Sequence, residues 1–386
     1  MATIGIDATA LSTKASGGIG TSQYQTMRAL AALDCPHRFL LYAATPPVTP
    51  FTGAPLDLPW PVRLGSGALA RSNTLWGQTV LGRRLVEDQV EVFWGPRHLL
   101  PRRAPGVAMV ATIHDFWHRY FPAQQPPLNR WADRVLIDRV LRQADVLIAP
   151  SEATARDAMR FSPQTAGKIR VIPWGVDERV FRPRQREETE ALLTRLGAVA
   201  PYVVSLDVFN PRKDFTTVLN ATARLNEPPG DALTVVGLGR PRGGSALVGV
   251  ETQVRRLALQ ERVVLPGDLT CEELACLYSG ATALCYPSLY EGFGMPILEA
   301  MACGCPVITA DNSSLPSVAG DAALLMEARD VDRLTRYMTL LSENRDERAR
   351  LAAAGLARAR LFTWKATAEG MLTAFEEALA LQRRSA

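Results

Sequence analysis

Residues 291–299 are Glu291-Gly-Phe-Gly-Met-Pro-Ile-Leu-Glu299, and this stretch is the most informative one for the fold. An apolar run with strand character, Ala283–Tyr286, precedes it. Gly292 and Gly294 allow the backbone to approach a ligand closely, and Pro296 suits the first position of a helix. The amides at such a helix start attract phosphate. We therefore expect a strand, a ligand-binding loop and a helix.

A carboxylate at Glu299 would lie about one turn inside that helix, in reach of sugar or ribose hydroxyls. A plain helix cap with an incidental second glutamate remains the alternative.

Length and composition indicate an ordinary globular protein of two domains. The chain has 386 residues, of which 47% are hydrophobic and 21% are charged, so each half can bury a core. No apolar run reaches the length of a membrane span, and the N-terminus lacks the pattern of a signal peptide. The six cysteines do not form a disulfide framework in a chain this long. These features predict a reduced, cytoplasmic protein.

Charge is distributed unevenly along the chain. Residues 1–182 carry 21 Lys and Arg against 14 Asp and Glu, whereas the remainder carries 22 against 25. Nucleic acid is a poor partner because no nucleic-acid-binding motif accompanies the basic half. An anionic acceptor or an anionic membrane surface fits better, and a solvated basic surface fits equally well. Trp131, Arg134 and Arg142 lead to the hypothesis of a peripheral protein at the inner face of the membrane.

Short apolar runs alternate with helical patterns along nearly the whole chain. Continuous apolar strands between helices predict parallel sheets covered on both faces, and two such sets predict two doubly wound α/β domains. We expect a Rossmann-like domain over residues 1–180, a second over residues 181–363, and a last helix over residues 364–386 that packs back on the first domain. The expected strands are Thr3–Asp7, Phe39–Tyr42, Val90–Trp94, Ala108–Ile113, Val146–Pro150, Arg170–Pro173, Tyr202–Leu206, Leu233–Val236, Val263–Leu265, Ala283–Tyr286, Val307–Thr309 and Ala323–Met326.

Three further groups follow expected strands, where ligands bind in open α/β folds. Gly17-Gly18 precedes a helical pattern that starts near Thr21, and such a turn admits a diphosphate. The strand that begins at Ala108 leads into His114, which can act on a ligand or be a satisfied structural histidine. Arg212-Lys213 could neutralise a leaving diphosphate or form a surface pair at a helix start.

Other chemistries find less support. Gly237-Leu-Gly239 starts like a dinucleotide fingerprint but lacks the third glycine, which weakens a nicotinamide-binding function. Asp330-Val-Asp332 has the spacing of a metal-binding D-x-D motif, yet it suits the cap of a following helix better. No serine-hydrolase elbow is present. A glycosidase pair formed by Glu291 and Glu299 is not excluded by spacing alone, although the phosphate-friendly helix start between them counts against it.

The stretch Tyr286-Pro-Ser-Leu-Tyr-Glu-Gly-Phe-Gly-Met-Pro-Ile-Leu-Glu-Ala-Met-Ala-Cys-Gly-Cys-Pro-Val-Ile308 resembles the signature of the family-4 retaining glycosyltransferases. Segments Ala144–Ile148, Ile172–Val176 and Asp321–Leu325 are also similar to the family. The resemblance implies the GT-B fold, in which two doubly wound Rossmann-like domains face a central cleft. It covers nearly the whole chain and is strongest over residues 200–330.

The resemblance also implies site residues. Glu291 would contact the donor sugar, and Glu299 would bind the ribose hydroxyls. Arg212 and Lys213 match the diphosphate-binding basic pair in part, because the family often has an arginine where this chain has Asp207. A second departure is Ser317, where the family commonly has glutamate. The remaining residues implied are Gly17 and Gly18 near the diphosphate, His114 facing the donor sugar, and Gly292, Phe293, Gly294 and Met295 around sugar and phosphate.

The sequence thus predicts a retaining hexosyltransferase that needs neither a metal nor a cofactor. It would move a hexose from a nucleoside-diphosphate sugar to a glycan or lipid-linked acceptor, in polysaccharide, lipopolysaccharide or glycolipid assembly. Pro211-Arg-Lys213 resembles mannosyltransferase members, which favours GDP-mannose, and a UDP-sugar remains an alternative. Two other classes stay open, a catalytically silent nucleotide-sugar-binding protein and a nicotinamide-dependent oxidoreductase.

Overall fold

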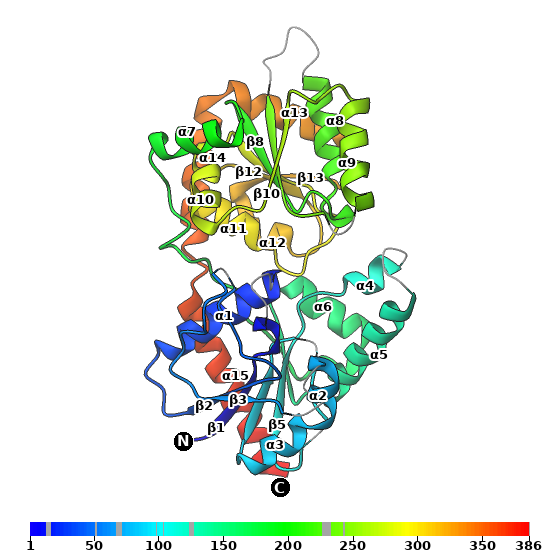
Figure 1. The fold of residues 1–386 in the computed structure, drawn as a ribbon, viewed down its shortest axis with the longest axis vertical. Coiled ribbons are helices and arrows are strands. Elements are labelled where there is room, and N and C mark those ends of the chain that lie inside the picture. Colours follow the sequence, from blue (N-terminus) through cyan, green and yellow to red (C-terminus); the bar gives the residue numbers. More distant parts are fainter. Residues whose placement is uncertain are drawn as a thin grey trace. The chain divides into compact units, whose positions relative to one another are not determined.

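The computed structural model describes residues 1–12, 17–50, 52–66, 72–97, 99–102, 104–122, 127–225, 233–241 and 244–385. The chain forms two compact units (Figure 1). Unit 1 comprises Met1–Gly175 together with Thr363–Ala386, and unit 2 comprises Val176–Phe362. The chain therefore enters unit 2 after Gly175 and returns to unit 1 at Thr363.

Unit 1 is built on a parallel sheet. Its described strands lie in the order β3-β2-β1-β4-β5-β6-β7, and every neighbouring pair is parallel. This order is that of a doubly wound sheet, because the chain runs outward from β1 in one direction and then from β4 in the other. The strands are β1 (Thr3–Asp7), β2 (Arg38–Ala43), β3 (Val62–Leu64), β4 (Val92–Gly95), β5 (Ala108–Thr112), β6 (Val146–Ala149) and β7 (Ile169–Val171).

Unit 2 repeats this plan with its own sheet. The described strands lie in the order β10-β9-β8-β11-β12-β13, again with parallel neighbours. The change of direction falls between β8 and β11. The strands are β8 (Tyr202–Leu206), β9 (Thr234–Leu238), β10 (Val263–Gly267), β11 (Ala283–Tyr286), β12 (Val307–Ala310) and β13 (Ala323–Met326).

Helices cover both faces of each sheet, as Figure 1 shows for unit 2, with α8, α9 and α13 on one side and α7, α10 and α14 on the other. The described helices are α1 (Gly17–Ala31), α2 (Asn73–Thr79), α3 (Leu81–Glu87), α4 (Trp117–Tyr120), α5 (Pro127–Gln143), α6 (Glu152–Phe161), α7 (Arg186–Leu196), α8 (Phe215–Leu225), α9 (Gly244–Arg256), α10 (Cys271–Gly280), α11 (Met295–Ala302), α12 (Leu315–Ala319), α13 (Val331–Glu343), α14 (Arg345–Ala359) and α15 (Trp364–Ser385).

Burial explains why these apolar runs form central strands. All four residues of β11 and all five of β5 are buried, which is the environment of a parallel strand covered on both faces. The core of unit 2 joins β-branched residues of the sheet, such as Val203 and Val235, to helix residues such as Phe215 and Leu334. The two parallel α/β sheets expected from the sequence are confirmed.

The last helix, α15, belongs to unit 1 and packs against α1 and β5. None of the helices in the described ranges has the length and apolar content needed to cross a bilayer. Each of the six cysteines is a free thiol.

The bounds of several strands, such as β4, β7, β9 and β10, differ from the expected ones by one or two residues. Two elements differ more. Strand β3 was not expected, because it has only three residues and lies half exposed at the sheet edge. Helix α1 starts at Gly17 and not near Thr21. Gly17 has a φ of +61°, a conformation that glycine adopts without strain. Gly17 and Gly18 are therefore part of the first turn of α1 and not a separate turn before it.

Candidate functional site

Unit 2 has a natural ligand position where its strand order changes direction, between β8 and β11. Loops that leave the carboxyl ends of two such strands diverge, and ligands of open α/β sheets bind in the space between them. Arg212 and Lys213 follow β8, and Glu291 follows β11. The sheet therefore brings together three of the residues singled out in the sequence.

The loop after β8 is held by its own side chains. Residues Pro211–Lys213 form a short 3₁₀ helix, and the Asn210 side chain caps it by accepting a hydrogen bond from the amide of Arg212 at 3.2 Å. The Asn210 amide group donates to Asp207 Oδ2 at 2.9 Å. Asp207 thus orients the cap that presents the two cations. It occupies the position where the resemblance implies an arginine, so its negative charge replaces a positive one near Lys213.

Glu291 is the centre of a buried polar cluster. Its Oε1 accepts hydrogen bonds from Lys213 Nζ at 2.6 Å, Tyr286 OH at 3.0 Å and Ser288 Oγ at 2.6 Å. Its Oε2 lies 3.3 Å from Arg212 Nη1. Lys213 Nζ also donates to the Tyr286 hydroxyl and lies 4.7 Å from the centre of the Tyr286 ring. One carboxylate therefore binds both cations of the preceding loop.

Burial and charge act against each other in this cluster. Glu291 is 6% exposed and Lys213 is 7% exposed. Burial raises the pKa of Glu291, but the charges of Lys213 and Arg212 and the hydrogen bonds to its carboxylate outweigh that effect and lower the pKa to about 2. Burial also lowers the pKa of Lys213, against the opposing effect of Glu291. Glu291 and Lys213 stabilise each other in their ionised forms. Either charge alone would be buried without a compensating partner.

The loop from Gly292 to Met295 leads directly into α11. Gly294 precedes the helix with a φ of +102°, and no side chain caps the helix start. Ser314 Oγ donates to the carbonyl oxygens of Glu291 at 2.9 Å and Phe293 at 2.8 Å, which fixes the loop from the side of α12. The uncapped amides at the start of α11 suit an anionic ligand.

Glu299 lies one turn into α11 and is half-buried. Within the described residues its carboxylate has neither a hydrogen-bond nor an ion-pair partner. Burial raises its pKa to about 7. A partly desolvated carboxylate of this kind gains from any ligand that donates hydrogen bonds to it.

The pKa values of Glu291 and Glu299 are displaced in opposite directions, as in an acid–base pair. Glu291, however, already uses both of its oxygens to bind Lys213 and Arg212. A nucleophile or general base needs a free oxygen aimed at substrate. The contacts therefore favour separate binding functions for the two glutamates over hydrolysis.

The other predicted residues, Gly17, Gly18 and His114, belong to unit 1. His114 follows β5, and its Nε2 lies 2.6 Å from the carbonyl oxygen of Pro96, which follows β4. Burial lowers the pKa of His114, so the imidazole is neutral at pH 7 and Nε2 donates to Pro96. The roles that the resemblance implies for these three residues stay predictions.

Four side chains of the cluster were not expected from the sequence. The sequence predicts only the end of a strand at Tyr286 and no role for Ser288, although both lie within the stretch that carries the resemblance. Ser313 Oγ accepts from the Glu291 amide at 2.9 Å, and Ser314 binds the loop carbonyls. Both serines lie beyond the carboxyl end of β12. Ligands of open α/β sheets bind at the carboxyl ends of strands, so this position could have indicated them.

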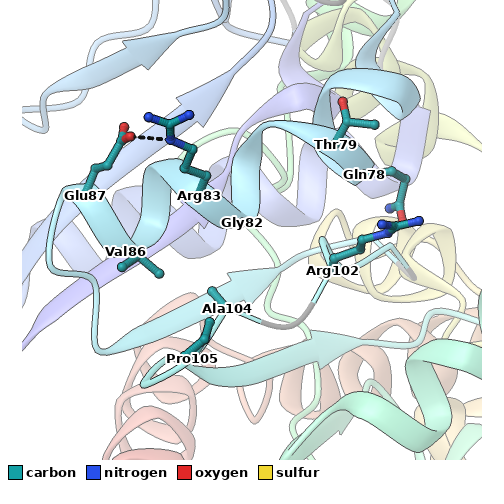
Figure 2. Close-up of a pocket in the computed structure, with 9 residues that line it drawn as sticks. All are labelled: Gln78, Thr79, Gly82, Arg83, Val86, Glu87, Arg102, Ala104 and Pro105. Carbon is teal, nitrogen blue, oxygen red and sulfur yellow. Dashed lines mark hydrogen bonds and ion pairs between the residues drawn. The ribbon is translucent and has the colours of Figure 1, made fainter.

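No group of three or more His, Cys, Asp or Glu side chains able to hold a metal ion occurs in the described part of the chain. The expected helix cap at Asp330 is confirmed, since its side chain accepts from the amide of Arg333 at 2.8 Å. A cavity of about 440 Å³ lies in unit 1 beside α2 and α3 (Figure 2). It contains none of the predicted site residues.

Comparison with known proteins assigns the family. The model of "Glycosyltransferase Family 4" matches residues 16–180, and that of "Glycosyl transferases group 1" matches residues 196–358. Together the two models cover most of both units. The chain belongs to glycosyltransferase family 4.

Similar curated proteins include two mannosyltransferases. The "MMP alpha-(1->4)-mannosyltransferase" of Mycolicibacterium hassiacum is 32% identical over 71% of this chain and 66% of its own length. The "O-antigen chain mannosyltransferase B" of Escherichia coli is 29% identical over 71% of each chain. The alignments thus span about two thirds of the length of each relative.

Solved structures support the fold. HepE from Anabaena, crystallised with UDP and glucose, superposes with a TM-score of 0.72 at 19% identity, over 97% of this chain and 98% of its own. With the two parallel α/β sheets, this similarity establishes the GT-B fold expected for a family-4 member.

Proposed function

We propose that this protein is a glycosyltransferase that moves a hexose from a nucleoside-diphosphate sugar to an acceptor hydroxyl, with retention of anomeric configuration and without a metal ion. One observation carries the proposal. Two cations, Arg212 and Lys213, are held by Glu291 at the switch point of the unit 2 sheet, next to the uncapped start of α11. This reaction requires positive groups that are already in place where the diphosphate leaves.

The chemistry follows from these groups. The bond between the anomeric carbon and the diphosphate oxygen breaks, and negative charge grows on the diphosphate. Lys213, Arg212 and the amides at the start of α11 would stabilise that charge, because they bind the leaving group more strongly than the intact donor. The acceptor oxygen would bond to the anomeric carbon on the same face of the sugar, and the departing phosphate would accept the hydroxyl proton, so no enzymic general base is assigned.

Mannose is the hexose that we favour, with GDP-mannose as its donor. Support comes from the two mannosyltransferases among the curated relatives and from the resemblance of Pro211-Arg-Lys213 to such enzymes. The acceptor would be a glycan or a lipid-linked saccharide in polysaccharide, lipopolysaccharide or glycolipid assembly. A cytoplasmic location fits the supply of nucleotide sugars.

A donor screen tests the proposal. Thermal unfolding is measured with GDP-mannose, UDP-glucose, UDP-N-acetylglucosamine and NADH as separate ligands. A ligand at 100 times its Kd stabilises the folded state by about 2.7 kcal/mol, so GDP-mannose should raise the Tm and NADH should not. Release of GDP or transfer to an acceptor then shows turnover. Donor binding without any sugar release would support the silent binding protein instead, and stabilisation by NADH alone would contradict the proposal.

The pH dependence of donor binding should report on Glu299. We propose that its carboxylate accepts hydrogen bonds from the ribose hydroxyls, which requires the ionised form. With a pKa of about 7 in the free protein, affinity should rise as pH increases through 7 and level off above it. At pH 6 it should be about tenfold weaker than on the plateau.

Glu299→Gln should abolish this pH dependence. The control is Glu261→Gln, which replaces an exposed glutamate of unit 2 and should leave the pH dependence unchanged. Calorimetry with the intact nucleotide sugar is the suitable measurement, because a free terminal phosphate titrates near pH 6 itself. A pH step of equal size in Glu299→Gln would assign it to another group.

Association with an anionic membrane surface is a further part of this proposal. Helix α5 exposes Trp131 (66%) and Val135 (44%), and the first 182 residues carry the excess of positive charge. Aromatic and basic side chains together favour binding at the headgroup level. In a flotation assay, phosphatidylglycerol liposomes should carry the wild-type protein upward. Trp131→Ser should float less than the control variant Leu361→Ser, in which an exposed leucine of unit 2 is replaced. A protein that stays in the dense fraction in all three forms would refute membrane association.

A further inference from the structure

Phe362 occupies a special position as the last residue of unit 2, immediately before the chain returns to unit 1. Its carbonyl oxygen accepts a hydrogen bond at 3.0 Å from the amide of Val176, the first residue of unit 2. The entering and leaving segments of the chain are thus bonded to each other at this residue. Phe362 lies between α14 and α15, and this bond fixes its backbone to a segment far away in the sequence.

The Phe362 side chain packs against the loop that precedes α11. Its ring lies 6.0 Å from the ring of Phe293, with an angle of 66° between the planes, an edge-to-face arrangement that aromatic pairs prefer. Phe293 is the residue between Gly292 and Gly294 and is itself 6% exposed. The two glycines add no side-chain contacts, so Phe293 supplies the buried apolar side chain of this part of the loop.

Arg358 connects the Phe362 ring to α12. Its guanidinium lies 5.0 Å from the centre of the Phe362 ring, donates from Nε to the Val318 carbonyl at 2.9 Å, and donates from Nη2 to the Ser317 carbonyl at 2.6 Å. At the other end of α12, Ser314 binds the carbonyl oxygen of Phe293. The loop is therefore held from two sides by one connected set of contacts.

We propose that Phe362 is a positioning residue for the donor-binding loop Gly292–Met295, acting through Phe293. The inference rests on the proposed function, because it assigns that loop to the sugar and phosphates of the donor. Amides contribute to charge stabilisation only when they are held in place beforehand. Displacement of such groups by about 1 Å can cost about 100-fold in rate. Removing the ring of Phe362 should loosen the loop without unfolding unit 2.

The test compares Phe362→Leu and Phe362→Met with Tyr337→Leu. Tyr337 is a matched control, since it is a half-buried aromatic residue of unit 2 with an arginine, Arg333, over its ring at 5.7 Å. Hydrogen exchange of the two bonded amides at the ends of the loop is measured first, without donor: that of Glu291, bonded to Ser313 Oγ, and that of Ile297, bonded to the Gly294 carbonyl oxygen. We expect at least about tenfold faster exchange in both Phe362 variants and wild-type exchange in the control. Phe362→Tyr, which keeps the ring, should restore slow exchange.

Donor binding and turnover are measured next on the same proteins. The Phe362 variants should raise the Kd and KM for the nucleotide sugar at least about tenfold, whereas Tyr337→Leu should lose thermal stability without such a change. Exchange and Kd that match Tyr337→Leu would overturn the inference. A wild-type protein that neither binds nor turns over any nucleotide sugar would remove the proposed function, and the exchange result would still decide whether Phe362 holds the loop.

Discussion

Glu291→Gln is expected to reduce sugar transfer about 10²- to 10³-fold, the usual cost of removing one electrostatic contact from a reacting centre. The amide keeps the size of the side chain but cannot neutralise Lys213 and Arg212, which both bind the carboxylate. A buried pair that loses one partner costs about 3–5 kcal/mol. The free energy of unfolding should therefore fall as well.

Chemical denaturation and single-turnover assays measure the two effects. The control is Glu273→Gln, because Glu273 binds Arg195 at the surface of the same unit, where an ion pair contributes about 0–1 kcal/mol. The difference in stability between wild type and Glu291→Gln has a defined pH dependence. The folded-state pKa of about 2 lies below the ordinary value of 4.5, so the stabilisation is complete above pH 4.5 and is lost as pH falls towards 2. A variant as stable as wild type at pH 7 would contradict this account.

Lys213→Met is expected to have the second largest effect, again a loss of transfer of about 100-fold or more, because Lys213 is a cation proposed to stabilise the leaving diphosphate. Lys365→Met, at a solvent-exposed lysine paired with Glu369, should retain transfer. Stability should fall too, since Glu291 would keep only the 3.3 Å contact with Arg212 and hydrogen bonds from Tyr286 and Ser288.

The double variant Glu291→Gln/Lys213→Met separates the two roles of this pair. The double variant removes the buried Lys213 charge that Glu291→Gln alone leaves uncompensated, so it should be more stable than the sum of the single losses predicts. Transfer should not recover, because the cation is still missing. Additive losses in stability would show that the two side chains do not stabilise each other.

The regular part of the fold was predictable because the chain repeats one simple pattern. Apolar runs such as Ala283–Tyr286 are buried on both faces, and burial of that kind leaves a clear trace in the sequence. Strand β3 leaves no such trace, since a half-exposed edge strand of three residues has neither length nor apolar character. The early start of α1 at Gly17 was missed because glycine is a poor helix former, and its place in the first turn depends on local geometry.

The candidate site was predictable only in part. Glu291, Arg212 and Lys213 could be named because each follows a strand, but the sequence did not show that one carboxylate binds both cations. That contact joins loops separated by 78 residues and depends on β8 and β11 being neighbours. Tyr286 was overlooked because its hydroxyl acts from the end of a buried strand, where a tyrosine is ordinarily a packing residue.

Unit 2 is inserted in the sequence of unit 1, and this has a consequence for the order in which the protein is made. A ribosome completes every residue of unit 2 before it begins α15. Until then α1 and the central strands of unit 1 lack the helix that covers them, so apolar surface there stays open to solvent. Unit 1 is therefore started before unit 2 and completed after it, and a nascent chain depends on α15 to cover the core that β4 and β5 contribute to.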